Sequence, residues 1–130
     1  MFQMRIEPRV SETDGVGHIN NTTIPIWLEA ARNPIFKLFT PDDSFANWKM
    51  ILLSIQVDYL SQIYFGTPVE IHTWVKRIGN TSLELYEEVY QRGHHCAKGK
   101  AVYVNYNQEK QVSELIPDNI RQELEKHLYS

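Results

Sequence analysis

The sequence predicts an α+β domain in which one long apolar helix packs against an antiparallel sheet of about five strands. Two patterns favour this fold class. Apolar residues recur at helical spacing between residues 24 and 39, which is typical of one buried helix face. Between residues 50 and 107, four segments alternate apolar and polar side chains with a period of two, and turn-forming stretches separate them. A curved sheet wrapped around the helix would cover its apolar face.

Composition places the chain among packed globular proteins. Its 130 residues predict a single domain, residues 1–130, with a sizeable core, and 42% of them are hydrophobic. The net charge of −3 argues against a nucleic-acid-binding protein. No apolar run is long enough for a membrane span. Cys96 is the only cysteine and the N-terminus lacks the apolar core of a signal peptide, so we expect a cytoplasmic location.

The first elements follow from proline positions. Residues 2–10 are predicted to form an edge strand, because Pro8 cannot donate to a sheet ladder. The central helix follows a polar, glycine-rich loop, and Pro25 suits its first turn. Pro34 lies inside the apolar pattern and predicts that the helix bends or breaks near Asn33.

The rest of the chain supplies the sheet and a closing helix. The predicted strands are residues 50–59, 69–78, 82–92 and 95–107. Gly93-His94 is the predicted turn between the last two of them. Residues 117–128 predict a short C-terminal helix with one apolar stripe.

Asp14 is the strongest candidate for chemistry. It lies in the polar loop that runs directly into the start of the apolar helix. A helix start offers free N–H groups and a partial positive charge, which can polarise a carbonyl group. A carboxylate beside it could act as a nucleophile or as a base for water. Asp-Gly sequences also form ordinary turns, so a purely structural aspartate is the alternative interpretation.

A family resemblance begins at these residues. The run Asp14-Gly-Val-Gly-His-Ile-Asn-Asn21, followed by Trp27, Glu29 and Arg32, resembles the signature of hotdog-fold thioesterases of the 4-hydroxybenzoyl-CoA thioesterase type. The likeness continues through Val57–Leu60, Gly66, the alternation over residues 69–75, Gly79 and Ser82. It implies a hotdog fold and hydrolysis of an acyl-CoA thioester by water. This chain departs from the family at Ile24, where a tyrosine is common, and at Pro25.

The resemblance also implies a set of site residues. It assigns the chemistry to Asp14 and an oxyanion-binding backbone amide to Asn21, with Gly17 and His18 in the same site. A loop histidine that only orders its turn is an equally good interpretation of His18. The candidate substrate contacts are Ile24, Tyr59, Ser82, Arg92, Lys98 and Lys100. The three basic residues among them are candidates for the coenzyme A phosphates, and exposed side chains without a ligand are the alternative.

Two further patterns favour structural interpretations. Glu29 and Arg32 are spaced to form an ion pair on the helix, and we expect that pair to be structural. The alternatives are that either residue faces a buried polar network or that Glu29 acts across a subunit boundary. His94, His95 and Cys96 are adjacent, but neighbouring residues of a strand point to opposite faces, which argues against a metal site. We therefore expect no metal, and the thioester hydrolysis that the resemblance implies needs no other cofactor.

The sequence leaves three functions open. An acyl-CoA thioesterase is favoured, and the alternatives are a thioesterase for acyl carrier protein and an acyl-thioester-binding protein without turnover. A carrier-protein partner favours a basic docking surface, which the net charge of −3 does not support. The resemblance further implies a homodimer or homotetramer with sites between subunits.

Overall fold

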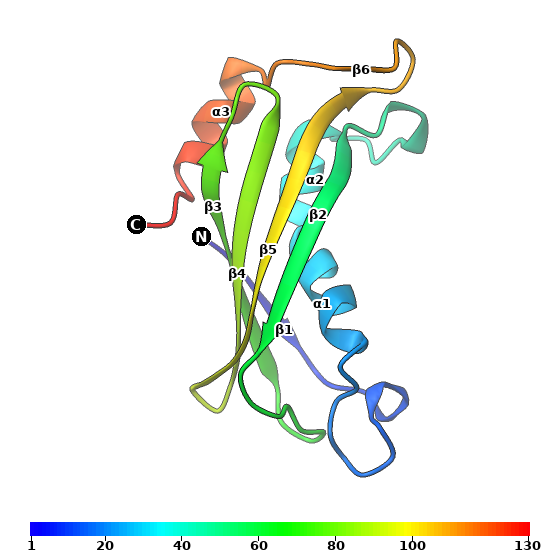
Figure 1. The fold of residues 1–130 in the computed structure, drawn as a ribbon, viewed down its shortest axis with the longest axis vertical. Coiled ribbons are helices and arrows are strands. Elements are labelled where there is room, and N and C mark those ends of the chain that lie inside the picture. The colour runs from blue at the N-terminus through cyan, green and yellow to red at the C-terminus, as the bar shows by residue number, and fades with distance from the viewer.

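The computed structural model describes residues 1–130 and contains one curled antiparallel sheet with helices packed against it (Figure 1). The strands are β1 (Phe2–Ile6), β2 (Met50–Tyr59), β3 (Val69–Ile78), β4 (Ser82–Gln91), β5 (His94–Asn107) and the short β6 (Val112–Ser113). Their order is β1-β3-β4-β5-β2, with β6 paired to β5. The predicted α+β class with an antiparallel sheet is confirmed.

Three α-helices accompany the sheet. They are α1 (Thr23–Ala31), α2 (Asn33–Phe39) and α3 (Asp118–Glu125), and two 3-10 turns cover Val10–Glu12 and Phe45–Asn47. In Figure 1, α1 and α2 run along the sheet, whereas α3 lies at the end of the sheet away from the start of α1. No helix here has the length and hydrophobicity that a membrane crossing requires.

The predicted break of the central helix is confirmed. Arg32 is the C-cap residue of α1 and the N-cap residue of α2, and Pro34 is the second residue of α2. In a first turn the missing proline N–H leaves no helix bond unmade. The single apolar stripe therefore continues over two helices that meet at Arg32.

Several predicted boundaries were wrong, and the C-terminal helix, predicted over residues 117–128, spans only Asp118–Glu125. The first strand ends at Ile6 rather than at residue 10, and a 3-10 turn follows. The β4–β5 turn is Arg92-Gly93 rather than Gly93-His94, with φ values of +53° and +76°. Positive φ at both central residues is the geometry of the tight hairpin turn that matches strand twist, so His94 already belongs to β5.

Helix α1 packs directly on the middle of β5. A Cβ atom added at Gly99 would lie 2.9 Å from Leu28 Cδ1, so this position faces the helix with no room for a side chain. Because side chains alternate along a strand, Lys98 and Lys100 point to the outer face of the sheet. The core has two apolar clusters, one beneath α1 around Leu28 and one beneath α2 and α3 around Ile35.

A buried ionic network involves the junction of α1 and α2. Arg32 Nε lies 2.9 Å from Glu87 Oε1, and Arg32 Nη1 donates to the Tyr103 hydroxyl at 3.0 Å. The Thr73 hydroxyl donates to the second Glu87 oxygen at 2.7 Å. The predicted Glu29–Arg32 pair is therefore wrong: Glu29 is exposed, and the acid that pairs with Arg32 comes from β4, across the core.

Strand β2 is an edge of the sheet and carries apolar side chains into solvent. Leu52, Leu53 and Ile55 are 43%, 60% and 47% exposed. The pairing of β2 with β5 shifts register between Leu52 and Ser54, which interrupts the predicted alternation. An exposed, apolar edge strand is a surface on which another chain can pair.

Candidate active site

The loop that carries Asp14 is a compact turn closed by backbone bonds. Thr13 pairs with Ile19, and the Asp14 N–H donates to the His18 carbonyl at 2.8 Å. Gly15 and Gly17 have φ values of +95° and +88°, which side chains rarely adopt. The Gly-x-Gly spacing in the sequence is thus a backbone requirement of this turn.

The two carboxylate oxygens of Asp14 face different partners. Oδ1 accepts a hydrogen bond from the Val16 N–H at 3.0 Å, as in an ordinary aspartate turn. Oδ2 lies 3.5 Å from His18 Nδ1, and the two side chains are 37% and 35% exposed. The turn-forming role is therefore present, and it occupies only one of the two oxygens.

The start of α1 lies directly after this loop. The Asn20 side-chain oxygen accepts bonds from the Thr22 N–H at 3.0 Å and its hydroxyl at 2.9 Å, so it orders the entry to the helix. The Asn21 N–H donates no hydrogen bond within the chain, whereas the Asn21 carbonyl accepts one from the Tyr59 hydroxyl at 2.7 Å. Burial raises the pKa of Tyr59, which keeps this hydroxyl a donor at neutral pH.

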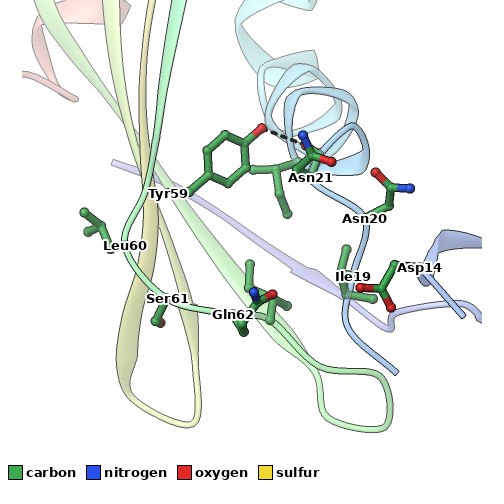
Figure 2. Close-up of a pocket in the computed structure, with 10 residues that line it drawn as sticks. Asp14, Ile19, Asn20, Asn21, Tyr59, Leu60, Ser61 and Gln62 are labelled. Atoms are coloured by element: carbon green, nitrogen blue, oxygen red, sulfur yellow. Dashed lines mark hydrogen bonds between the residues drawn. The ribbon is translucent and has the colours of Figure 1, made fainter. Parts of the chain in front are cut away.

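These groups line one hollow of about 480 Å³. Its lining residues are Asp14, Ile19, Asn20, Asn21, Ile24, Tyr59, Leu60, Ser61, Gln62 and Ile63. Figure 2 shows Asp14 and the two asparagines on one side, with Ser61 and Gln62 on the loop opposite. We call this the Asp14 hollow. Asp14 and Asn21, whose backbone N–H makes no hydrogen bond within the chain, thus line the same space.

In the opposite wall, residues 60–63, only Leu60 belongs to a stretch that the family resemblance covers. The position of this wall depends on bonds between chain segments far apart: the Ile19 N–H donates to the Ile63 carbonyl at 2.7 Å, and the Phe65 N–H to the Gly17 carbonyl at 2.9 Å. Sequence reasoning therefore missed Leu60, Ser61 and Gln62 as lining residues, and only their place directly after a strand could have indicated them.

Glu12 anchors the Asp14 loop to the helix. Its carboxylate is buried and accepts bonds from the Arg9 N–H at 2.7 Å and the Trp27 indole N–H at 2.8 Å, while its carbonyl accepts from the Asn20 N–H at 2.8 Å. Burial acts to raise the pKa of Glu12, but the hydrogen bonds from Arg9 and Trp27 outweigh it and hold the pKa below the ordinary value. The carboxylate stays ionised and keeps the loop against α1.

The structure brings some predicted site residues together and separates others. Asp14, Asn21, Ile24 and Tyr59 line the hollow, with His18 against Asp14 and Gly17 in the same turn. Ser82 begins β4 opposite Val104, at the far end of the sheet from the hollow.

The basic candidates divide in the same way. Arg92 lies in the β4–β5 turn, at the same end of the sheet as Tyr59, whereas Lys98 and Lys100 point to the outer face of the sheet. No cluster of three or more His, Cys, Asp or Glu side chains has the geometry of a metal site.

Comparison with known proteins identifies the family. The family model of the thioesterase-like superfamily matches residues 8–124. The chain belongs to the thioesterase-like superfamily. The uncharacterized protein YsmA of Bacillus subtilis (strain 168) is a relative at 31% identity over 109 residues, which are 83% of this chain and 74% of YsmA. The resemblance to hotdog-fold thioesterases is thus confirmed at the level of the family.

Solved structures of thioesterases share the fold over almost the whole chain. A predicted thioesterase from Bacillus stearothermophilus is 56% identical, covers 99% of this chain and 97% of its own, and superposes with a TM-score of 0.95. A thioesterase from Thermus thermophilus, solved in complex with coenzyme A and Zn, is 26% identical over 96% of this chain and 92% of its own, with a TM-score of 0.83. The hotdog-type arrangement of sheet and helix is therefore established for this chain.

Proposed function

We propose that this member of the thioesterase-like superfamily hydrolyses acyl-CoA thioesters to a free acid and coenzyme A. The observation that carries the proposal is that Asp14 and Asn21, whose backbone N–H makes no hydrogen bond within the chain, line the same hollow. The coenzyme A bound by the Thermus thioesterase supports coenzyme A as the thiol carrier.

The proposed reaction uses the two groups in different ways. The thioester oxygen accepts a hydrogen bond from the Asn21 N–H as negative charge develops on it, and the helix start adds a partial positive charge. The Asp14 Oδ2 atom, which the Val16 turn leaves available, either takes a proton from attacking water or attacks the carbonyl carbon itself. When Asp14 acts as the base, water adds to the carbonyl carbon, the carbon–sulfur bond breaks, and the proton that Asp14 took from water passes to the leaving thiolate. When Asp14 attacks, an acyl–Asp14 anhydride forms as the thiolate leaves, and water then hydrolyses this anhydride, which releases the acid, restores the carboxylate and supplies the proton of the thiol.

The site is proposed to be completed by a second copy of the chain. Tyr59, which lines the hollow, is the last residue of β2, the edge strand that exposes Leu53 and Ile55. Pairing of two β2 strands would cover these apolar side chains and bring a second subunit next to the hollow. A homodimer, or a homotetramer built from it, is therefore part of the proposal, and a cytoplasmic location stays a prediction.

A binding protein without turnover is the second candidate. The turn bond from the Val16 N–H to Asp14 is the observation that favours it, because it gives this aspartate a structural purpose. Hydrolysis of acyl carrier protein thioesters is a third outcome of the same assays.

Asp14→Asn decides between these candidates. The variant retains a side-chain oxygen for the turn and loses the charge, so kcat should fall at least ~10²-fold while KM stays similar. The matched control is Asp42→Asn, since Asp42 makes the same kind of turn bond to the Ser44 N–H at 3.1 Å, away from the hollow. Thiol release is measured over short, long and aromatic acyl-CoA substrates and acylated carrier protein.

The outcomes separate cleanly. A folded Asp14→Asn protein that hydrolyses its best substrate within a few-fold of the wild type would refute the mechanism. Binding of acyl-CoA by a wild type that hydrolyses no thioester would instead support the binding protein.

A further inference from the structure

A second hollow adjoins the Asp14 hollow. Its volume is about 570 Å³ and its lining residues are Ser61, Gln62, Tyr64, Gln91, Arg92 and His94. Ser61 and Gln62 line both spaces, so the two hollows share one wall. We call the second one the Arg92 hollow. Its lining contains a guanidinium and an imidazole but no aspartate or glutamate, which makes it suited to an anion.

Arg92 occupies a backbone position that its side chain does not favour. It is the first central residue of the β4–β5 turn, with φ of +53°, where asparagine and glycine are the usual residues. Its Nε and Nη2 atoms donate to the Thr67 hydroxyl at 3.2 Å and 2.9 Å. A neutral hydroxyl orients the guanidinium without neutralising it, so the positive charge and the remaining N–H donors stay available to a ligand.

The frame of this hollow is held in advance by a buried side chain. Gln91 is 6% exposed, and its amide group bonds to the Tyr64 N–H at 3.0 Å and to the Tyr64 and Thr67 carbonyls at 2.8 Å and 2.9 Å. These bonds fasten the loop after β2 to the end of β4. The residue that orients Arg92 and the loop that forms the shared wall are therefore positioned before any ligand binds, which lowers the entropic cost of binding.

We propose that the Arg92 hollow binds a phosphate group of the thiol carrier while the acyl thioester occupies the Asp14 hollow. This inference rests on the proposed function and names the residue that would bind the thiol leaving group of that reaction. A thioester held at Asp14 has its acyl chain on one side of the reacting carbon and its carrier on the other. Because Ser61 and Gln62 line both hollows, a carrier that leaves the Asp14 hollow along these two residues comes next to Arg92, whose planar guanidinium matches phosphate oxygens in a forked geometry.

The same geometry selects among the basic candidates. Lys98 and Lys100 point to the outer face of the sheet, away from the wall that both hollows share. Arg92 is therefore the phosphate contact, and the two lysines are not.

The test combines a protein variant with truncated substrates. Arg92→Asn removes the guanidinium and suits the left-handed backbone, so the turn is retained. Lys98→Gln is the control for lost positive charge. Each protein is assayed with the same acyl group on coenzyme A, on phosphopantetheine and on pantetheine, which carry several, one and no phosphate groups.

The expected result is a rise in KM of about tenfold for phosphate-bearing substrates in Arg92→Asn, the low end for losing a charge-assisted hydrogen bond. The kcat value and all constants for acyl-pantetheine should stay within twofold, because Arg92 is remote from the reacting bond. If KM rises for both phosphorylated substrates, the phosphate attached to pantetheine binds in this hollow. Acyl carrier protein bears the same phosphate. An effect on acyl-CoA alone places the nucleotide phosphates there.

Two results would overturn the proposal. One is an unchanged KM for acyl-CoA in Arg92→Asn, and the other is an equal rise for acyl-pantetheine. Both leave thioester hydrolysis at Asp14 intact, so they are distinct from a failure of the proposed function. Should the wild type hydrolyse no substrate, calorimetric binding of coenzyme A and of pantetheine to the same variants gives the same comparison.

Discussion

Removal of Arg32 should destabilise this protein more than the loss of any surface ion pair. The Arg32 side chain is 4% exposed and its partner Glu87 is 1% exposed. In Arg32→Met the hydrocarbon fills the space while the Glu87 carboxylate keeps only the Thr73 hydroxyl as a hydrogen-bond donor. An uncompensated buried charge of this kind costs ~3–5 kcal/mol. At ~2.1 cal/mol/K per residue, a chain of 130 residues loses roughly 11–18 °C in Tm.

The destabilisation should depend on pH in a defined direction. Burial raises the pKa of Glu87, and the Arg32 charge opposes that effect. Without Arg32 the pKa of Glu87 in the folded protein rises further above its value in the unfolded chain. Between the ordinary carboxyl pKa and the raised one, unfolding therefore releases a proton, and the free energy of unfolding falls as pH rises. The deficit of Arg32→Met should be smaller at pH 5.5 than at pH 7.5.

Urea unfolding at both pH values measures this effect. Lys37→Met is the control, because it breaks an ion pair of 2.7 Å between side chains that are 60% and 56% exposed, and such pairs contribute under ~1 kcal/mol. The double variant Arg32→Met/Glu87→Met should recover most of the loss, since it leaves no buried charge. A deficit below ~1 kcal/mol, or one that is equal at both pH values, would refute the argument from an unpaired carboxylate.

Three further predictions concern the loop, the helix start and the sheet edge. Tyr59→Phe removes the 2.7 Å hydrogen bond to the Asn21 carbonyl. The kcat value should fall about three- to tenfold while KM stays nearly unchanged. A change in KM alone would contradict a positioning role for Tyr59. Glu12 has a lowered pKa in the folded protein, so its contribution to stability is present above the unfolded value of 4.5 and is lost as pH falls through the folded pKa. Glu12→Gln weakens the bond to Trp27, so its free energy of unfolding at pH 7 should be lower than that of the wild type. In urea titrations at pH 3.5 the two free energies should be closer. An equal difference at both pH values would exclude the charge as the cause. Ile55→Lys places a charge on the exposed edge and should shift light scattering from dimer to monomer, whereas a wild type that is already monomeric at micromolar concentration contradicts the proposed assembly.

The sequence by itself determined the features that depend on short stretches of chain. The period of the apolar residues predicts the helix and the long strands, and Pro34 predicts the break, because each pattern acts through neighbouring backbone positions. One side of the Asp14 hollow was also predictable. Asp14, Asn21 and Ile24 lie within eleven consecutive residues, so the loop and the helix start place them together independently of the strand order in the sheet.

Only the tertiary structure decided which distant segments meet these residues. Residues 60–63 form the opposite wall because β2 ends at Tyr59 beside the start of α1, a position set by strand order rather than by local pattern. The pairing of Arg32 with Glu87 joins residues 55 positions apart, and a local spacing rule pointed to the wrong acid. The placement of Lys98 and Lys100 on the outer face follows from the contact between Gly99 and Leu28. Each of these contacts depends on sheet register and helix packing. Their partners lie far apart in the sequence, and no local sequence pattern indicates which of them meet.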